Sequence, residues 1–286
     1  QWVPPITNEE KAIFNRGKNP VFENADSKLF VVKNGNQILG RIAALINWIE
    51  VKEQAKTKVR FGWYDTIDDL DVSRMLIGAV HSWGKQNGLT YLEGPMGFSN
   101  MDKAGVLVQG YEYKNTMITW YHYPYQKKHL EDLGLIKQAE WVEFQIKIFK
   151  PEDAPEKVKK YAELISKRYE LSALEFSTRK ELVPYVDKMF DLLNKTYNNL
   201  QSFVPIQPNQ VTHYKEKYFS YIHPKFIKCV VDKSGNLIAF AITMPSFSEA
   251  LKKVNGSLYP FGFFHIMRAL RKNNRASFYL IGIDPA

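Results

Sequence analysis

The feature that most constrains the fold is a short stretch that occurs twice. Residues 31–45 read VVKNGNQILGRIAAL, and residues 230–244 read VVDKSGNLIAFAITM. In each copy two valines lead into a polar turn with a glycine, Gly35 or Gly235, and a second apolar run follows. Because β-branched residues on both sides of a Gly/Asn turn favour two antiparallel strands, each copy predicts a β-hairpin. Two unrelated hairpins can share such a pattern. The similar order of the elements around them favours one module used twice.

The length of the chain and a charged, proline-containing segment near its middle predict two domains. At 286 residues the chain exceeds the size at which a single hydrophobic core usually stops growing. Apolar and polar residues alternate over residues 138–149, as in a long strand, and the charged, proline-containing run KPEDAPE follows at 150–156. We therefore expect one domain over residues 1–150 and a second over residues 151–286.

The remaining periodicities predict an α/β fold with a mixed sheet in each half. Val72, Leu76 and Val80 mark one apolar face of a helix that Asp68 or Asp69 can cap. Further strands are expected at 59–64, at the aromatic run 117–123 and at 277–283. Helices are expected at 125–133, 157–169 and 182–197. Mixed strand and helix signals of this kind are typical of the α/β and α+β classes.

Composition narrows the choice of partners only a little. No apolar run reaches the length that spans a bilayer, and we expect no membrane partner. The net charge of +9 is dispersed along the chain, which favours an anionic small molecule, an acidic substrate or weak nucleic-acid contact without choosing among them. The cationic run HIMRALRKNNR at 265–275 suits phosphates of a cofactor or of RNA, but a solvated helix face is the simpler interpretation.

Cysteine and histidine usage argues against a metal site. The single cysteine, Cys229, excludes an internal disulfide and lies in an apolar strand, where it is expected to pack in the core. His122 and His129 are seven residues apart and lack carboxylates at ligand spacing, so no metal is expected. No nucleotide-binding or nucleophile-elbow motif occurs. With one thiol and no disulfide, a reducing, cytoplasmic location is expected.

Several segments are similar to parts of the GNAT superfamily of acyl-CoA-dependent acyltransferases. The run LIGIDPA at 280–286 resembles that family's central strand and the turn that follows it. Residues 245–262, 38–47 and 92–100 resemble segments of uncharacterised bacterial proteins with two tandem GNAT domains, and residues 125–135 look like a helix of that superfamily. The resemblance implies two tandem GNAT-like domains of mixed α/β structure.

The resemblance also implies a site at the end of the last strand. Backbone groups of Ile281, Gly282 and Ile283 would contact acetyl-CoA or another acyl-CoA as co-substrate. Asp284 would act as the base, although an aspartate before proline is also a common turn residue. Tyr279 would approach the substrate, although an aromatic residue on a central strand is also a core residue.

Two departures from the family pattern weaken that site. The acidic turn DTIDDLDVSR at 65–74 lacks the phosphate-binding glycines, so the first domain is expected to be a degenerate copy. The sequence ends at Ala286, where the family's glycine-containing loop would begin, so the second domain is expected to be incomplete. We therefore expect this chain to bind acetyl-CoA weakly or not at all.

Two functional hypotheses follow from the sequence. The first is an acyl-CoA-dependent N-acyltransferase whose second domain acts on a small-molecule or peptide amine. The second is a non-catalytic binding or scaffold protein of the same fold that recognises an aminoacyl or nucleotide ligand. The sequence specifies neither the acceptor nor the acyl group nor the oligomeric state.

Overall fold

The computed structural model describes residues 1–147, 150–218 and 223–285. They form two compact units, and each unit combines helices with a four-stranded sheet. The first unit comprises residues 1–140, 201–204 and 245–275, and the second comprises 141–200, 205–244 and 276–286. The expected α/β class is confirmed, and the first sheet is mixed because it contains antiparallel and parallel pairs. The domain boundary at residue 150 stays a prediction.

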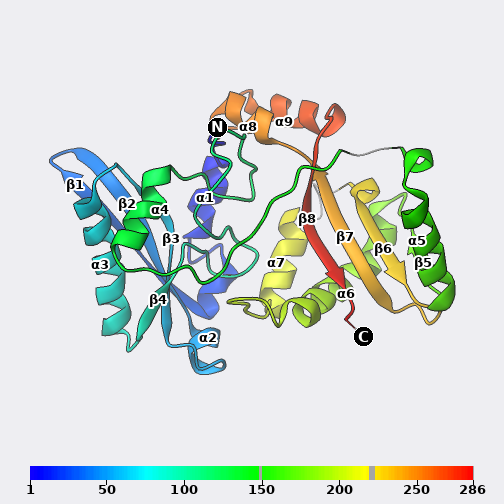
Figure 1. Ribbon diagram of the computed structural model, residues 1–286, viewed down its shortest axis with the longest axis horizontal. Helices are drawn as coiled ribbons and strands as arrows, with labels where there is room; N and C mark the ends of the chain where they lie inside the picture. The colour runs from blue at the N-terminus through cyan, green and yellow to red at the C-terminus, as the bar shows by residue number, and fades with distance from the viewer. Residues whose placement is uncertain (148–149, 219–222, 286) are drawn as a thin grey trace. The chain divides into compact units, whose positions relative to one another are not determined.

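The sheet of the first unit has the strand order β1-β2-β3-β4 (Figure 1). Its strands are β1 (Ala25–Asn34), β2 (Gln37–Asn47), β3 (Lys58–Thr66) and β4 (Tyr91–Glu93). The pairs β1–β2 and β2–β3 are antiparallel, and β3–β4 is parallel. A parallel pair needs a crossover, and the chain supplies one as α3 (Leu70–Gln86), which packs against the sheet.

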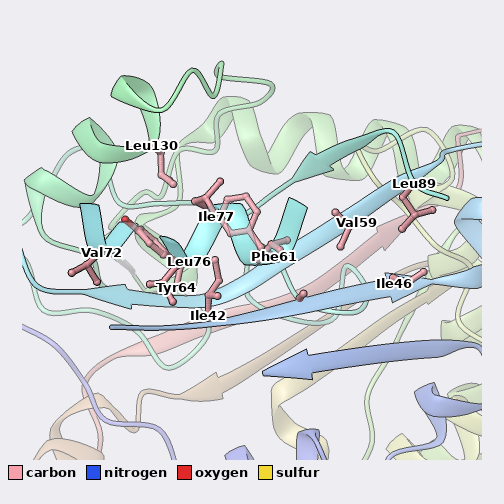
Figure 2. Close-up of a cluster of buried hydrophobic side chains, with 12 residues drawn as sticks. Ile42, Ile46, Val59, Phe61, Tyr64, Val72, Leu76, Ile77, Leu89 and Leu130 are labelled. Carbon is pink, nitrogen blue, oxygen red and sulfur yellow. The ribbon is translucent and has the colours of Figure 1, made fainter. Parts of the chain in front are cut away.

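Strand β2 is buried on both faces and organises the core of the first unit. Ile42, Ala44 and Ile46 belong to the cluster that includes residues of α3, whereas Ala43 and Leu45 belong to a second cluster on the other side. Figure 2 shows the first cluster, to which Leu76 and Ile77 of α3 and Leu130 of α4 contribute. This arrangement explains why the second strand of the repeated stretch is apolar without alternation.

Both predicted hairpins are confirmed. In the first, Gly35 has φ 56° between β1 and β2. In the second, Gly235 has φ 79° between β6 (Ile227–Val231) and β7 (Leu237–Pro245). Glycine tolerates this left-handed backbone conformation without steric cost, so the turn residue fixes the position of each hairpin.

Two groups of helices complete the first unit. The first group is α1 (Thr7–Ile13), η1 (Pro20–Glu23), α2 (Trp48–Lys52) and α4 (Pro124–Asp132). The second is α8 (Ser248–Val254) and α9 (Gly262–Arg271), which pack against each other. The Thr7 backbone N–H donates to the carbonyl of Gly256 at 3.0 Å, and a Cβ on Gly256 would lie 2.3 Å from the Pro5 carbonyl oxygen. This close backbone contact attaches the α8–α9 segment to the N-terminal residues.

The second unit has a sheet in the order β5-β6-β7-β8. Its other elements are η2 (Pro151–Asp153), α5 (Glu156–Arg168), β5 (Ser172–Leu174), α6 (Arg179–Tyr197), α7 (Pro208–Tyr218), η3 (Pro224–Phe226) and β8 (Ala276–Ile283). In this second sheet the pairs β5–β6 and β6–β7 are antiparallel, so a mixed sheet there stays a prediction. Helix α6 buries Leu182, Val186, Met189 and Leu193 at helical spacing and contacts β8 and α7. The helix and strand assigned to 182–197 and 277–283 are therefore confirmed within a few residues.

The two sheets are not equivalent, and tandem GNAT domains are not confirmed. The hairpin β1–β2 forms one edge of its sheet, with β3 and β4 added on one side. The hairpin β6–β7 lies in the middle of its sheet, between β5 and β8. A repeated hairpin is therefore present without the same arrangement of neighbouring strands.

Two predicted strands are wrong. The aromatic run 117–123 is turn and irregular structure, because side chains fold it locally: Thr119 Oγ donates to Asn115 Oδ1 at 2.7 Å, and the Tyr121 hydroxyl donates to the Tyr111 carbonyl at 3.0 Å. Residues 138–147 form no strand although their pattern alternates, because no neighbouring strand pairs with them within the described residues. Residues 148–149 of that prediction lie outside the described residues.

Within the described ranges, no helix combines the length and the apolar character needed to cross a membrane.

Candidate functional site

The carboxylate predicted to act as a base, Asp284, lies just after the edge strand β8. Its backbone N–H donates to the Ile238 carbonyl of β7 at 2.8 Å, which fixes the end of the strand. Both carboxylate oxygens lie 2.7 Å from Nζ of Lys195, in the last turns of α6. The Asp284 side chain is 17% exposed and that of Lys195 is 53% exposed. The structure therefore places the candidate base in a partly exposed ion pair that the sequence did not predict.

The backbone residues predicted to hold an acyl donor lie on β8. The Ile281 carbonyl accepts a hydrogen bond of 3.0 Å from the Tyr197 hydroxyl, and burial raises the pKa of Tyr197. A Cβ on Gly282 would lie 2.7 Å from the ring of Phe240, so close packing in the sheet explains this glycine. Ile281 and Ile283 are 48% and 60% exposed. Tyr279 is half-buried on the same strand.

Together the end of β8 and the last turns of α6 present a carboxylate, an ammonium group and a phenol near exposed apolar side chains. Carboxylates and phenols are groups that transfer protons in enzymes. The roles assigned to Asp284, Tyr279 and residues 281–283 stay predictions, because geometry alone does not assign a reaction to them.

A larger polar cluster, which the sequence analysis missed, lies inside the first unit. Lys58 and Arg60 of β3 and Glu50 of α2 are each at most 2% exposed. Glu50 Oε1 lies 2.9 Å from Lys58 Nζ and 2.7 Å from Arg60 Nη2, and Arg60 Nε donates to Glu50 Oε2 at 2.7 Å. Lys58 also donates to Glu93 Oε2 at 2.6 Å and to Ser202 Oγ at 2.7 Å. We call these residues the buried ionic network.

The buried ionic network is charge-balanced, with Glu50 and Glu93 opposing Lys58 and Arg60. Burial by itself raises the pKa of Glu93, but hydrogen bonds from Lys58 and Ser202 outweigh it and hold the pKa below its usual value. Arg60 also donates to the carbonyls of Gly97 and Ser202 at 3.0 and 2.8 Å. The network therefore joins β3, β4, α2 and two irregular segments, and its chemistry is that of a structural core.

One sequence signal could have revealed this network. Lys58 and Arg60 are two residues apart on a strand whose neighbours Val59 and Phe61 are apolar and buried. Two cations on one face of a buried strand require carboxylate partners, because an unpaired buried charge is costly. The sequence did not indicate that Ser202, 144 residues from Lys58, supplies one of the partners.

A second set of polar contacts, buried at Ser73 and His129 and exposed at Asp68, has the residue types of a hydrolase triad. His129 Nδ1 lies 2.9 Å from Ser73 Oγ, and His129 Nε2 lies 3.2 Å from Asp68 Oδ1. Ser73 is fully buried, and its hydroxyl also contacts the Tyr64 hydroxyl at 2.8 Å. Burial raises the pKa of Tyr64 to about 12. A serine without access to a substrate carbonyl cannot act as a nucleophile, so these contacts have a structural role.

The neighbouring acidic turn has a separate structural role. Asp69 caps α3, because its Oδ1 accepts from the N–H groups of Asp71 and Val72 at 2.8 and 3.3 Å. This confirms one of the two capping residues expected from the sequence. Asp68 pairs with His129 instead.

No group of three or more potential ligand residues for a metal occurs among the residues that the structure describes.

Comparisons with known proteins find curated relatives with low sequence identity to this chain. No family model matches it. It is 24% identical over 274 residues to "Protein YghO" of Escherichia coli (strain K12), covering 94% of this chain and 68% of that protein. It is 22% identical over 272 residues to "Bacterial ceramide synthase" of Caulobacter vibrioides (strain NA1000 / CB15N), covering 94% of this chain and 69% of that protein.

The solved structure of L-PGS from Bacillus licheniformis covers 91% of this chain and 59% of that chain, with 10% identity and a TM-score of 0.29. A likeness at that score supports no conclusion about fold or function.

These comparisons overturn the resemblance to the GNAT superfamily. Two curated proteins that match 94% of the chain are YghO and bacterial ceramide synthase, and no family model matches. The run LIGIDPA, which carried part of the resemblance, begins in the apolar strand β8, and Asp284 and Pro285 follow that strand. Such a pattern recurs wherever an apolar strand ends in a turn, so it has little power to identify a family.

Proposed function

We propose that this chain catalyses, or forms part of an enzyme that catalyses, the transfer of an acyl group to an amine. The observation that carries the proposal is the match to bacterial ceramide synthase over 94% of the chain. Ceramide is the amide of a fatty acid and a long-chain amino alcohol, so its synthesis joins an acyl group to an amine nitrogen. We propose a lipid amine of this class as the acceptor.

The chemistry asks for a proton acceptor and an activated acyl donor. The uncharged amine attacks the carbonyl carbon of an acyl thioester, the new C–N bond forms, and the C–S bond breaks. The amine gives up a proton, and the leaving thiolate takes one. Asp284 is the proposed acceptor of the amine proton, directly or through a water molecule. Lys195 is a positioning residue, because it contacts both carboxylate oxygens at 2.7 Å.

The surroundings of Asp284 support a lipid acceptor. Ile281 and Ile283, which lie within three residues of Asp284 along the chain, are 48% and 60% exposed. Exposed apolar side chains next to a carboxylate suit an amine that carries an alkyl chain, because burying the chain against them is favourable. Either coenzyme A or a carrier protein can present the thioester in this proposal.

The test is an acyl-transfer assay on the purified chain. The reaction contains a long-chain amino alcohol and long-chain acyl thioesters of coenzyme A or of a carrier protein, and mass spectrometry detects the amide. We expect Asp284→Asn to lower the rate about 100-fold or more, in line with the usual contribution of a general base. Asp191→Asn removes an exposed carboxylate of α6 and is expected to leave the rate unchanged.

A binding protein without catalysis is the second candidate, and one observation favours it. The candidate base is held by Lys195, and the Ile281 carbonyl is already bonded to Tyr197. The same samples distinguish the two functions. Saturable binding of the amino alcohol with no amide formed from any thioester would support the binding protein.

A further inference from the structure

Helix α9 and the loop before it expose a run of large apolar side chains in the first unit. The exposed fractions are 72% for Phe261, 57% for Phe264, 39% for Phe263, 42% for Met267 and 38% for Leu270. Tyr259, before the helix, is 79% exposed. No residue of α9 is buried. Single exposed apolar residues are normal on a protein surface, but a contiguous group of this size marks an interaction surface.

The helical spacing gathers these side chains on one face. Phe263, Met267 and Leu270 follow each other at i, i+4 and i+7, so they form a stripe along α9. Ile266, at i+3 from Phe263, lies on the same face, and it is half-buried, as is Ala269. Arg268 and Arg271 are exposed as well, and each comes directly after a residue of the stripe, Met267 or Leu270. We call the stripe, its neighbour Phe264, the loop aromatics Tyr259 and Phe261, and the cations of this segment the α9 surface.

The charge of the α9 surface has a single sign. No aspartate or glutamate occurs between Glu249 and Asp284. The cations of this interval are Lys252, Lys253, Arg268, Arg271, Lys272 and Arg275. Glu249 itself is paired with Lys114. Cations next to aromatic and aliphatic side chains complement a surface that is anionic outside and apolar beneath.

We propose that the α9 surface docks onto an anionic lipid surface, with the helix lying in the plane of the interface. Phenylalanine and tyrosine side chains would enter the boundary between headgroups and acyl chains, and the arginines and lysines would contact lipid phosphates. Nucleic acid would pair with the cations but leave the apolar stripe in water. The sequence pattern alone favours a solvated helix face and no membrane partner. The exposed apolar stripe on α9 favours a lipid surface instead.

The proposal does not depend on the acyl transfer proposed above, because it concerns binding and is tested without catalysis. The contact of the α8–α9 loop with the N-terminal residues, through Thr7 and Gly256, attaches the α9 surface to the first unit. Docking would therefore hold the whole first unit at the lipid surface.

Helix α5 provides a matched control within the same chain. It also exposes apolar side chains, among them Val158 at 56% and Leu164 at 52%. It also contains two acidic residues, Glu156 and Glu163, among five basic ones, and Lys159 is paired with Glu156. Helix α5 carries charges of both signs and has no phenylalanine. It is therefore expected to bind lipid much less than the α9 surface does.

The experiment is co-sedimentation of the full chain with vesicles of phosphatidylcholine, with and without about 30 mol% phosphatidylglycerol. We expect binding to the anionic vesicles that weakens at about 0.5 M salt. The double variant Phe263→Ser, Phe264→Ser and the double variant Arg268→Glu, Arg271→Glu should each weaken binding at least about tenfold. Two double variants of α5 are the controls: Val158→Ser with Leu164→Ser, and Lys160→Glu with Lys167→Glu. Both should bind vesicles as the parent does. Circular dichroism checks that every variant is folded.

Three results would overturn the proposal. The first is no binding to anionic vesicles by the folded parent. The second is equal loss of binding in the α5 and α9 variants, which would indicate a nonspecific effect of charge. The third is a dimer in analytical ultracentrifugation that the Phe263→Ser, Phe264→Ser variant abolishes while vesicles bind neither protein, which would assign the α9 surface to a second copy of the chain.

Discussion

At the scale of single residues, burial decides the chemistry of several titratable groups. Cys229 lies on β6 with no exposed surface, and burial raises the pKa of its thiol to about 12. His122 is 2% exposed, and burial lowers its pKa to about 4. Both groups are therefore uncharged in the folded protein at neutral pH, and both report on unfolding.

Cys229 is predicted to be inert toward thiol reagents in the folded chain. The thiolate is the reactive form, and a buried thiol with a pKa of about 12 supplies almost none of it at pH 8. Ellman's reagent should release no colour from native protein over an hour, and one equivalent after guanidinium is added. Rapid reaction of the native chain would show that β6 opens readily or that the thiol is accessible.

His122 is predicted to make the protein less stable in acid. Its pKa is about 4 when folded and near 6.5 when unfolded, so the unfolded chain binds the proton more tightly in the interval between them. The stability due to the neutral imidazole is complete above about pH 6.5 and is lost as the pH falls toward 4. The total change is about 3 kcal/mol.

Urea unfolding at a series of pH values measures this dependence. In His122→Asn the amide oxygen can replace Nδ1, which accepts from the Leu107 N–H at 3.3 Å. That variant should flatten the curve between pH 4 and 6.5, whereas the exposed His81→Asn should leave it unchanged. An equal slope in both variants would contradict the assignment to His122.

At the scale of elements, the buried ionic network holds β3, β4 and α2 together. Glu50→Gln keeps the size of the side chain but leaves Lys58 and Arg60 with one carboxylate less in a buried site. Breaking a buried pair in this way costs about 3–5 kcal/mol. Chemical denaturation should show a loss of this size, and Glu53→Gln, an exposed neighbour on the same segment, should change the stability by less than about 0.5 kcal/mol. A loss below about 1 kcal/mol would mean that water reaches the network.

The elements also show where sequence reasoning succeeds and fails. Both hairpins, the helix around Leu76 and the last strand follow from periodicity and turn residues, because these signals are local. Residues 138–147 carry a strand pattern but have no partner strand in the described part of the chain, and pairing is a property of two segments. The buried ionic network was missed for the same reason, because Ser202 and Gly97 come from distant parts of the sequence.

At the scale of the whole molecule, the order of the sequence and the order in space differ. Residues 201–204 and 245–275 belong to the first unit although they follow the first residues of the second. The sequence predicts a candidate site at the end of β8, which stays a prediction, and it missed Lys195 and Tyr197 of α6, which contact Asp284 and Ile281. Contacts between a strand and a helix more than 80 residues earlier have no local signature.

Family assignment from short segments failed at this scale as well. Short segments and the order of the elements suggested the GNAT superfamily, whereas over 94% of its length the chain is 24% identical to YghO and 22% identical to bacterial ceramide synthase. A pattern of a few residues records local structure, and only similarity sustained over both units carries information about the function of a whole chain.

Transfer of an acyl group to a lipid amine can be measured directly. The purified chain is incubated with a deuterium-labelled long-chain amino alcohol and a long-chain acyl thioester, and the products are separated and weighed by mass spectrometry. We expect a labelled amide that increases with time and with protein concentration, and we expect the Asp284→Asn variant to form it about 100-fold more slowly. Absence of the amide with thioesters of both coenzyme A and a carrier protein, from protein that is folded, would contradict the proposed acyl transfer.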